Sequence, residues 1–342
     1  MDDARKRRKH RNADPLKIKL ALVCTSGGHF EQMQNLSEFY SNYSHFWITS
    51  KNTQTAASLG GERKYYLKIA HFKQPWTYLY QLPQCLRIFI KERPTHLLST
   101  GSGRVVFLPF LLSIIFRSKF IHIETFSHVN RLTKLGRLLS KMRYPILSQW
   151  RSSDNANVVY IGPIMKKETP SEARQKGKNL VFVTLGTRTE AFPRLIAAVE
   201  SLIREGVIKE HVVVQAGHTK YESGQMEIFS YRPPTAIDDL IRNASYVITQ
   251  ESAGIGTKCL KYNTRMIVMP RDYSHGELPA KSDMNEDLHY RLQEFGLAFV
   301  VADVEELRAA IRNLDKLKVG FIFDNSLAVA KLKELVENSI DP

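Results

Sequence analysis

The chain has 342 residues, of which 43% are hydrophobic and 24% are charged, and its formal net charge is +15. This composition is typical of a globular protein and excludes a chain that is mainly disordered, collagen-like or mucin-like. At about 150 residues to a domain, the length predicts two domains. The excess of basic residues indicates an anionic partner, which could be a nucleic acid, an acidic membrane face or a phosphorylated substrate.

Neither a disulfide framework nor a membrane span is expected. Cys24, Cys85 and Cys259 lie far apart without a CxxC spacing, which indicates no zinc site and a reducing compartment. The longest apolar run, at residues 105–116, is shorter than the ~20 residues that a spanning helix needs. The basic N-terminal segment lacks the apolar stretch of a secretory signal. We therefore expect a protein that is soluble or lies on a membrane without crossing it.

The first half of the chain alternates short apolar runs with helical patterns, after a basic tail at residues 1–16 that we expect to be flexible. An apolar run that ends in glycine or a polar turn predicts a buried strand, and apolar residues at helical spacing predict the helix that follows. We place the first domain at residues 17–164. Its predicted strands are residues 18–26, 45–50, 95–103 and 119–127, and its predicted helices are residues 29–40 and 77–93. Further apolar segments lie at 105–116 and 158–164.

A polar and charged stretch at residues 165–178 predicts a linker. The same alternation resumes in a second domain at 179–342. Its predicted strands, with their turns, are residues 180–186, 211–217, 245–256, 265–271 and 297–301, and its predicted helices are residues 192–206, 235–244, 286–296, 304–314 and 326–340, the last two of which close this domain. The sequence therefore predicts two doubly wound α/β domains in tandem.

Glycine turns follow predicted strands in both domains. In open parallel sheets, ligands bind beyond the carboxyl ends of the strands. Glycine lets the backbone approach a ligand closely, and the N-terminus of the next helix attracts phosphate. The turns therefore predict a phosphorylated ligand in a cleft between the domains. No P-loop, no GxGxxG after the first strand and no GxSxG is present, which weighs against a kinase, an ordinary dehydrogenase or an esterase.

The order of the motifs resembles a family of glycosyltransferases. VCTSGGHFEQM, HFWITSK, HLLSTGSG, FIHIETFSHVNRLT and LSQW are similar to the acceptor-side PssD-type subunit of two-component polysaccharide glycosyltransferases. That subunit is related to the membrane-associated subunit of the eukaryotic enzyme that adds the second N-acetylglucosamine to dolichol-linked sugar. LVFVTLGT, VVVQAGHTKYE and ITQESAGIGTKCLKYNTRMIVMPR are similar to the donor-side PssE-type partner and to the C-terminal half of MurG. The chain resembles a fusion of both subunits over residues 18–325.

The resemblance implies a GT-B-type fold, in which two Rossmann-like doubly wound domains face each other across a cleft. It implies inverting transfer of a hexose, with glucuronate favoured, from a UDP-sugar to a polyprenyl-diphosphate-linked sugar in polysaccharide or glycan-precursor synthesis. No metal and no other cofactor is expected. The implied place of action is the cytoplasmic face of the cell membrane, with the protein bound peripherally to an anionic surface. No nucleic-acid module is recognisable, so we expect no nucleic-acid partner. The oligomeric state is left open.

In the first domain, the resemblance implies binding of the acceptor or its phosphate by the glycine turns, through Ser26, Gly27, Gly28, Gly101, Ser102 and Gly103. The catalytic base is expected nearby. His29 follows a strand and two glycines, and an imidazole titrates close to neutrality. Glu124 lies between apolar residues near a strand end, where a carboxylate should be paired or functional, and it matches a glutamate of MurG. We predict His29 or Glu124 as the base, unranked, with His128 in reserve.

In the second domain, we expect donor contacts from Gly186, Thr187, Arg188, Gln215, His218, Glu251, Ser252, Ala253, Gly254, Arg271 and Asn285. Arg188 would stabilise the charge of the leaving diphosphate, whereas Thr187 could equally be a helix cap. Arg271 would bind a glucuronate carboxylate through its planar fork. Lys258 stands where the family has a ribose-binding glutamate, and Met284-Asn285 stand where it has a His-Gln pair. A guanine or thymine nucleotide is therefore the alternative to UDP.

Residues 75–90 mix aromatic, apolar and basic side chains, as an interfacial helix does, and residues 105–116 fit either such a helix or the core. Three other functions are possible. A nucleotide-sugar 2-epimerase of the same fold needs no lipid and would leave the basic tail and the aromatic helix unexplained. A nucleic-acid-binding protein would explain the charge but lacks a module. A non-catalytic scaffold would explain only the departures in the donor loop.

Overall fold

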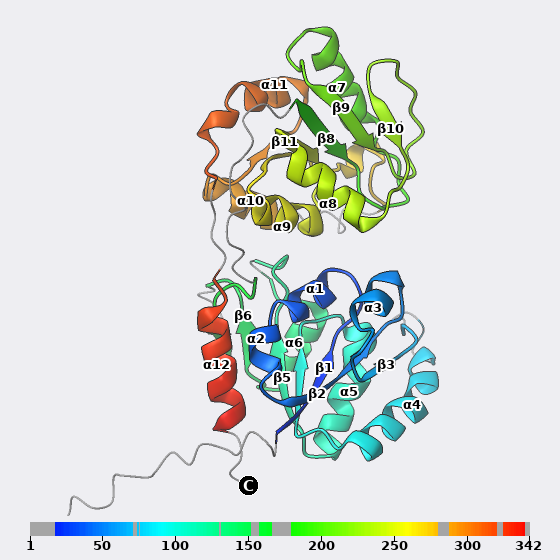
Figure 1. Ribbon diagram of the computed structural model, residues 1–342, viewed down its shortest axis with the longest axis vertical. Coiled ribbons are helices and arrows are strands. Elements are labelled where there is room, and N and C mark those ends of the chain that lie inside the picture. The colour runs from blue at the N-terminus through cyan, green and yellow to red at the C-terminus, as the bar shows by residue number, and fades with distance from the viewer. Residues whose placement is uncertain are drawn as a thin grey trace, which may run out of the picture. The chain divides into compact units, whose positions relative to one another are not determined.

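The computed structural model describes residues 18–70, 74, 76–129, 131–151, 157–165, 179–279, 287–319 and 324–338 (Figure 1). The chain divides into two compact units, which are residues 1–167 with 323–342, and residues 168–322. Each unit contains one sheet with parallel strands. The predicted α/β fold of two doubly wound Rossmann-like domains is therefore confirmed. The predicted tail at 1–16, most of the predicted linker at 165–178, and Asn285 lie outside the described residues.

The first unit is built on a seven-stranded sheet in the order β3-β2-β1-β4-β5-β6-β7. Its strands are β1 (Lys19–Val23), β2 (Ser44–Thr49), β3 (Lys64–Tyr66), β4 (His96–Ser99), β5 (Lys119–Ile123), β6 (Ile146–Ser148) and β7 (Val158–Tyr160). The strand order reverses beside β1, which pairs with both β2 and β4. In doubly wound sheets this reversal opens a crevice beyond the carboxyl ends of the strands. The ends of β1 and β4 are therefore where a ligand is expected.

Helices cover both faces of this sheet, because β1 turns alternate apolar side chains to opposite faces. Leu20 and Leu22 join one core, and Ala21 and Val23 join the other. The helices are α1 (Gly28–Gln34), α2 (Ser37–Tyr40), α3 (Thr53–Ser58), α4 (Thr77–Glu92), α5 (Gly103–Ile115), α6 (Lys134–Lys141) and α12 (Ser326–Glu337). Side chains of α1, α2 and α12 fill the first core, and those of α4, α5 and α6 fill the second.

The last helix, α12, belongs to the first unit, so its predicted place in the second domain is wrong. Its residues Ala328, Leu332 and Val336 are fully buried in the core that α1 and α2 share, and Figure 1 shows α12 beside α2. The hydroxyl of Tyr43 donates to Glu337 at 2.9 Å. An amphipathic pattern shows that a helix has a buried face, but not which sheet that face covers.

The second unit is built on a six-stranded sheet in the order β10-β9-β8-β11-β12-β13. Its strands are β8 (Leu180–Thr184), β9 (His211–Gln215), β10 (Glu227–Phe229), β11 (Tyr246–Thr249), β12 (Arg265–Val268) and β13 (Phe299–Val300), and its helices are α7 (Pro193–Arg204), α8 (Pro234–Asn243), α9 (Ala253–Lys261), α10 (Asp287–Glu294) and α11 (Val304–Arg312). The order reverses beside β8, which pairs with β9 and β11. The loops after β8 and β11 therefore flank the crevice of this unit.

Candidate functional site

In the first unit, His29 is the second residue of α1 and lies at the crevice beyond the carboxyl ends of β1 and β4. Its Nδ1 lies 2.8 Å from the carbonyl oxygen of Thr100, and the Thr100 hydroxyl donates to the carbonyl of His29 at 2.7 Å. Because a carbonyl can only accept, the ring proton lies on Nδ1 and Nε2 keeps its lone pair. Burial lowers the pKa of His29 below 6.5, although the Thr100 carbonyl opposes the shift. A neutral imidazole with Nε2 as an acceptor is the form that a general base requires.

The glycine turn after β4 makes room for this ring. Gly101 has φ = +117°, and a Cβ atom there would lie 2.7 Å from Cε1 of His29. Ser102 has a positive φ of 65° without being glycine, and it precedes α5, which begins at the buried Gly103. On the other turn, Gly27 precedes α1 and Gly28 begins it, while Ser26 is held by hydrogen bonds with Ser50 at 2.9 and 3.0 Å. The structure thus brings the turns after β1 and β4 against His29.

Glu124 lies deeper than His29 and is only 2% exposed. Its Oε2 accepts from the hydroxyl of Thr133 at 3.2 Å and lies 3.8 Å from Nε2 of His122. Burial acts to raise the pKa of Glu124, but His122, Thr133 and His128 outweigh it and hold that pKa below its ordinary value. The carboxylate is therefore ionised, and its Oε2 is held by its neighbours, whereas Oε1 is buried without a hydrogen-bond partner among the described residues. Of the two unranked candidates, His29 is the better placed to take a proton.

His122, which the sequence analysis did not single out, completes this group of titratable side chains. It is 1% exposed, and its Nδ1 lies 3.4 Å from the hydroxyl of Ser99. The half-buried His128 follows in the turn after β5, where its backbone N–H donates to Thr125 at 3.1 Å. His122 and Glu124 are separated by one residue of a strand, so period-two alternation could have placed both on one face.

Two glutamine side chains, Gln32 of α1 and Gln149 after β6, connect α1 to the ends of β5 and β6 by hydrogen bonds. Nε2 of Gln149 donates to Oε1 of Gln32 at 2.8 Å and to the carbonyl of Glu124 at 3.0 Å. Gln32 in turn donates to Thr125 at 3.2 Å, and Gln149 accepts from the backbone of Ile164 at 3.0 Å. This network fixes the backbone around Glu124, and the sequence pattern gave no indication of it.

In the second unit, Arg271 is not available to a ligand, and its predicted role as the partner of a glucuronate carboxylate is wrong. It is 2% exposed, and its guanidinium donates to backbone carbonyls of Glu190 at 2.8 Å, Leu185 at 3.2 Å and Glu277 at 3.3 Å. Its Nε donates to Gln250. The sequence pattern placed Arg271 directly after a strand. It did not show that carbonyl groups of neighbouring loops surround the Arg271 side chain.

Glu251, in contrast, retains an unsatisfied oxygen. Its Oε2 accepts from the backbone N–H of Arg271 at 2.9 Å, whereas Oε1 is buried without a hydrogen-bond partner among the described residues. Burial raises the pKa of Glu251, and the favourable charges of Arg188 and Arg271 only partly oppose the shift. A carboxylate oxygen in this state suits a hydroxyl donor.

Glu251 precedes a helix start that can accept a negative charge. Ser252 caps α9, with its hydroxyl 3.4 Å from the N–H of Ile255, and Ala253 and Gly254 form the first turn of that helix. Backbone N–H groups in a first helical turn favour phosphate. Further along α9, Lys258 forms an ion pair with Asp238 of α8 at 2.6 Å. The side chain of Lys258 is thus paired with a carboxylate of the neighbouring helix.

The remaining predicted donor residues divide into exposed and buried side chains. After β8, Gly186 and Arg188 are half-buried and Thr187 is exposed. Gln215 is 6% exposed and accepts from Thr184 at 2.8 Å, so it joins the ends of β8 and β9 rather than facing outward. His218 is exposed and meets the ring of Tyr231 edge-on, with 5.6 Å between centroids. Tyr231, 48% exposed, was missed because β10 was not predicted from its few residues.

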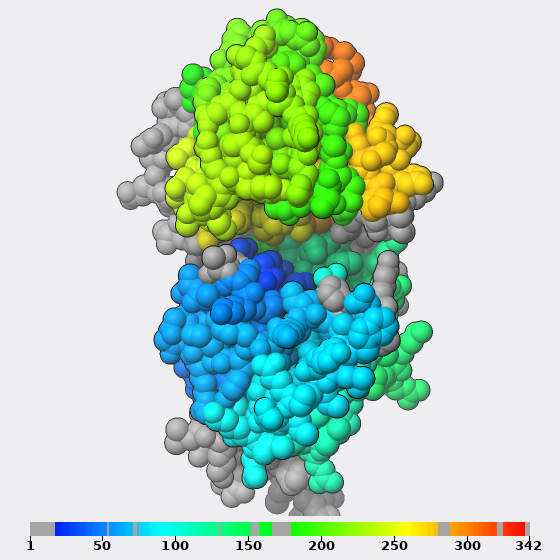
Figure 2. Space-filling model, turned by 90° about the vertical axis from the view of Figure 1, so that its right-hand side faces the viewer, coloured from blue at the N-terminus to red at the C-terminus, as the bar shows by residue number. Residues whose placement is uncertain are grey.

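An apolar face extends over α4, α5 and α6 of the first unit, where α4 packs on α5 and α5 on α6. We define it by its exposed large side chains, which are Trp76, Leu79, Tyr80, Leu82, Leu86, Ile90, Leu111, Ile114, Ile115, Leu138 and Met142. Figure 2 shows part of this side of the unit, coloured from light blue to cyan. Within the segment 105–116, Val105 and Phe110 are buried in the core, whereas Ile115 is 72% exposed.

Exposed basic residues lie along the same helices, namely Arg87, Lys91, Arg104, Lys134, Arg137 and Lys141. Among the described residues, no helix has the length and apolar character to cross a membrane, and no group of three or more His, Cys, Asp and Glu side chains could hold a metal ion.

No family model matches the chain, and no curated protein matches its sequence. Solved structures resemble it over nearly its whole length. MurG from Acinetobacter baumannii matches with a TM-score of 0.60 at 12% identity, covering 94% of this chain and 99% of that one. The calicheamicin glycosyltransferase CalG4 matches with a TM-score of 0.60 at 12% identity, covering 96% and 100%.

UDP-GlcNAc 2-epimerase from Methanocaldococcus jannaschii matches with a TM-score of 0.67 at 12% identity, covering 93% and 99%. A second structure of that epimerase, in complex with UDP-GlcNAc and UDP, matches with a TM-score of 0.61. At these identities the similarity concerns the fold. The chain therefore has a GT-B-type fold made of two Rossmann-like units.

Proposed function

We propose that the protein is a glycosyltransferase that moves a hexose from a UDP-sugar to an acceptor hydroxyl, with inversion and without a bound metal. The observation that carries this proposal is His29. Its Nδ1–H is committed to the carbonyl of Thr100, so Nε2 is the proton acceptor at the crevice of the first unit.

The reaction follows from these roles. Nε2 of His29 takes the proton of the acceptor hydroxyl while its oxygen forms a bond to the anomeric carbon. The bond from that carbon to the diphosphate oxygen breaks on the opposite face, and UDP leaves with the electron pair. The negative charge of Glu124 favours the imidazolium that results. Arg188 and the N-terminal N–H groups of α9 stabilise the charge on the leaving diphosphate.

The acceptor is proposed to be a polyprenyl-diphosphate-linked sugar, in polysaccharide or glycan-precursor synthesis. The apolar face with its basic residues supports this choice, because such a surface suits the boundary of an anionic bilayer. The protein would then act as a peripheral protein at the cytoplasmic face of the cell membrane. Glucuronate remains the favoured sugar, on the resemblance of the sequence motifs to PssD/PssE-type enzymes.

A direct test is release of UDP from a panel of UDP-sugars in the presence of a lipid-diphosphate-linked sugar. We expect release that depends on both substrates and a β-linked product from an α-linked donor. Retention at the anomeric carbon, or preference for a guanine or thymine nucleotide, would contradict the proposal. Flotation with anionic liposomes, beside duplex DNA as a competing polyanion, tests the membrane partner.

The second candidate is a nucleotide-sugar 2-epimerase, favoured by the match to the M. jannaschii enzyme, whose TM-score of 0.67 exceeds that of MurG. Incubation with UDP-GlcNAc in deuterated water, without any acceptor, separates the two. An epimerase incorporates deuterium at C2 of the sugar, whereas a transferase without an acceptor leaves C2 unlabelled.

A further inference from the structure

The loops at the carboxyl ends of β8, β11 and β12 are joined by the single buried side chain of Arg271. Its guanidinium reaches the carbonyls of Leu185 and Glu190 in the first loop and of Glu277 in the third, and its Nε reaches Gln250 in the second. The ring of Phe192 lies under the guanidinium, at 4.8 Å from its centre. Only the planar fork of arginine presents donors in so many directions within one plane.

The backbone of the same residue holds Glu251. The N–H of Arg271 donates to Oε2 at 2.9 Å, which fixes the carboxylate and leaves the buried Oε1 without a partner among the described residues. A buried acceptor without a partner costs free energy until a donor reaches it. One residue therefore sets the position of Glu251 and of the loop that carries Arg188.

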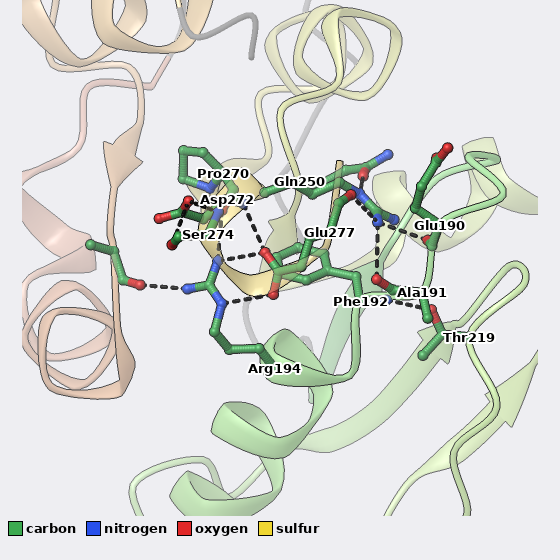
Figure 3. A network of polar contacts seen from close by, with 12 residues as sticks. Glu190, Ala191, Phe192, Arg194, Thr219, Gln250, Pro270, Asp272, Ser274 and Glu277 are labelled. Carbon is green, nitrogen blue, oxygen red and sulfur yellow. Dashed lines mark hydrogen bonds and ion pairs between the residues drawn. The ribbon is translucent and has the colours of Figure 1, made fainter. Parts of the chain in front are cut away.

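A second, partly buried network lies next to this one and provides a comparison (Figure 3). Arg194 donates through Nε and Nη2 to the two carboxylate oxygens of Glu277, both at 2.9 Å, and to the carbonyls of Pro270 and Ala302 at 2.9 and 2.6 Å. It packs on the same ring of Phe192, at 5.3 Å. Its hydrogen bonds go neither to Glu251 nor to the loop of Arg188.

We propose that Arg271 is a positioning residue of the donor site, which holds Glu251 so that Oε1 accepts a hydrogen bond from a hydroxyl group of the nucleotide sugar. This inference rests on the proposed function, since it requires a nucleotide sugar in the second unit. In this proposal Glu251 contacts the ligand, and Arg271 holds the Glu251 carboxylate in the position that this contact requires.

The test compares Arg271→Lys with Arg194→Lys, using a UDP-hexose in calorimetric titration and thermal unfolding on the same samples. Both variants lose a fork of hydrogen bonds, so we expect both to unfold at lower temperature. We expect only Arg271→Lys to weaken UDP-hexose binding, by about tenfold or more, because small misplacements of a binding group cost large factors. Arg194→Lys should remain within about twofold of the wild type.

A double-mutant cycle distinguishes a positioning role of Arg271 from a merely structural one. If Arg271 acts through Glu251, Arg271→Lys weakens binding far less in a Glu251→Gln background than in the wild type. Should Arg271→Lys fail to fold, Gln250→Met removes one acceptor of the same bridge and is expected to weaken binding in the same direction. Equal binding by wild type and these variants, or strictly additive effects, would overturn the positioning role alone. A wild type that binds no UDP-hexose would overturn the proposed function with it.

Discussion

Each unit of the protein has a glutamate just beyond a central strand, and the two glutamates behave in opposite ways. Glu124 follows β5 and Glu251 follows β11. The pKa of Glu124 is lowered despite its burial, because a hydroxyl and a neighbouring imidazole outweigh the loss of water. The pKa of Glu251 is raised, because burial outweighs one backbone N–H and the nearby arginines. The partners of a carboxylate, and not its depth alone, decide its charge.

This difference assigns different tasks to the two units. In the first, the ionised carboxylate lies near a histidine whose Nε2 has an available lone pair. In the second, the carboxylate is held by the backbone N–H of Arg271, and its Oε1 is buried without a hydrogen-bond partner among the described residues, as is Oε1 of Glu124. The first arrangement suits proton transfer and the second suits binding of hydroxyl groups.

The largest expected effect comes from removing the proton acceptor. His29→Gln should lower turnover by at least ~10²-fold, since a positioned base contributes ~10²–10⁴-fold. Binding of UDP should be unchanged, because the proposed donor residues lie in the second unit. Glu124→Gln should lower turnover less, since its carboxylate is bound to Thr133 and lies close to His122. Steady-state rates and UDP titrations check both variants, and a His29→Gln protein with near-normal turnover would place the base elsewhere.

Crowding the carboxylate of Glu124 should destabilise the first unit. In Gly136→Ala the new Cβ would lie 2.1 Å from Oε2 of Glu124, so the buried side chain must move. We expect the free energy of unfolding to fall by about 1–3 kcal/mol, in the range of overpacked cores. Gly61→Ala is the matched control, because its Cβ meets no atom within 4 Å. Urea unfolding should leave that control within about 0.5 kcal/mol of the wild type; equal stabilities would mean that Glu124 is not held in place.

The two glutamates should also give stability opposite dependences on pH. The folded-state pKa of Glu124 lies below its ordinary value of 4.5, so its ionised form stabilises the fold above that value, and this contribution disappears as the pH falls through the folded-state pKa. The folded-state pKa of Glu251 lies above 4.5, so its contribution is present at low pH and disappears as the pH rises through the folded-state pKa.

Wild type should therefore gain stability with rising pH relative to Glu124→Gln and lose it relative to Glu251→Gln. Urea unfolding between about pH 3 and pH 8 measures both differences. Two slopes of the same sign would contradict the comparison between the units.

The smallest expected effect on stability concerns the apolar face. Leu79→Ser with Ile115→Ser removes side chains that are 68% and 72% exposed, so the free energy of unfolding should change by no more than about 0.5 kcal/mol for each. Flotation with anionic liposomes should nevertheless weaken, because apolar area would no longer enter the bilayer boundary. Val159→Ser, at a 39% exposed residue of β7, serves as the control. Unchanged flotation would show that another surface meets the membrane.

The sequence predicted the sheets well because buried parallel strands must be apolar throughout. Strands such as β1 and β8 are therefore recognisable as apolar runs between polar turns. Three strands of three residues each, β3, β6 and β10, were nevertheless missed. β3 and β10 lie at sheet edges, where that constraint is absent, and β6 is internal but too short to give a recognisable run. His29 could be chosen as a candidate from its turn, but its proton position depends on a carbonyl 71 residues away in the chain.

The roles of Arg271 and Glu251 could not be predicted for a related reason. A pattern of residues along one strand end shows which side chains stand there, but not which carbonyls of other loops will reach them. The hydrogen-bond partners of the two glutamates arise from contacts between different segments, which only the folded structure defines.

The place of α12 has a consequence for synthesis on the ribosome. The first unit is discontinuous in sequence, because residues 168–322 intervene before its final segment. Translation proceeds from the N-terminus, and domains generally fold as units while the chain emerges. The second unit is contiguous and can close its core as soon as its own residues have left the tunnel. The first unit, although translated first, leaves Phe39 and its neighbours without the cover of Leu332 until the last helix is released, so the nascent chain completes its units in the reverse of their order of synthesis.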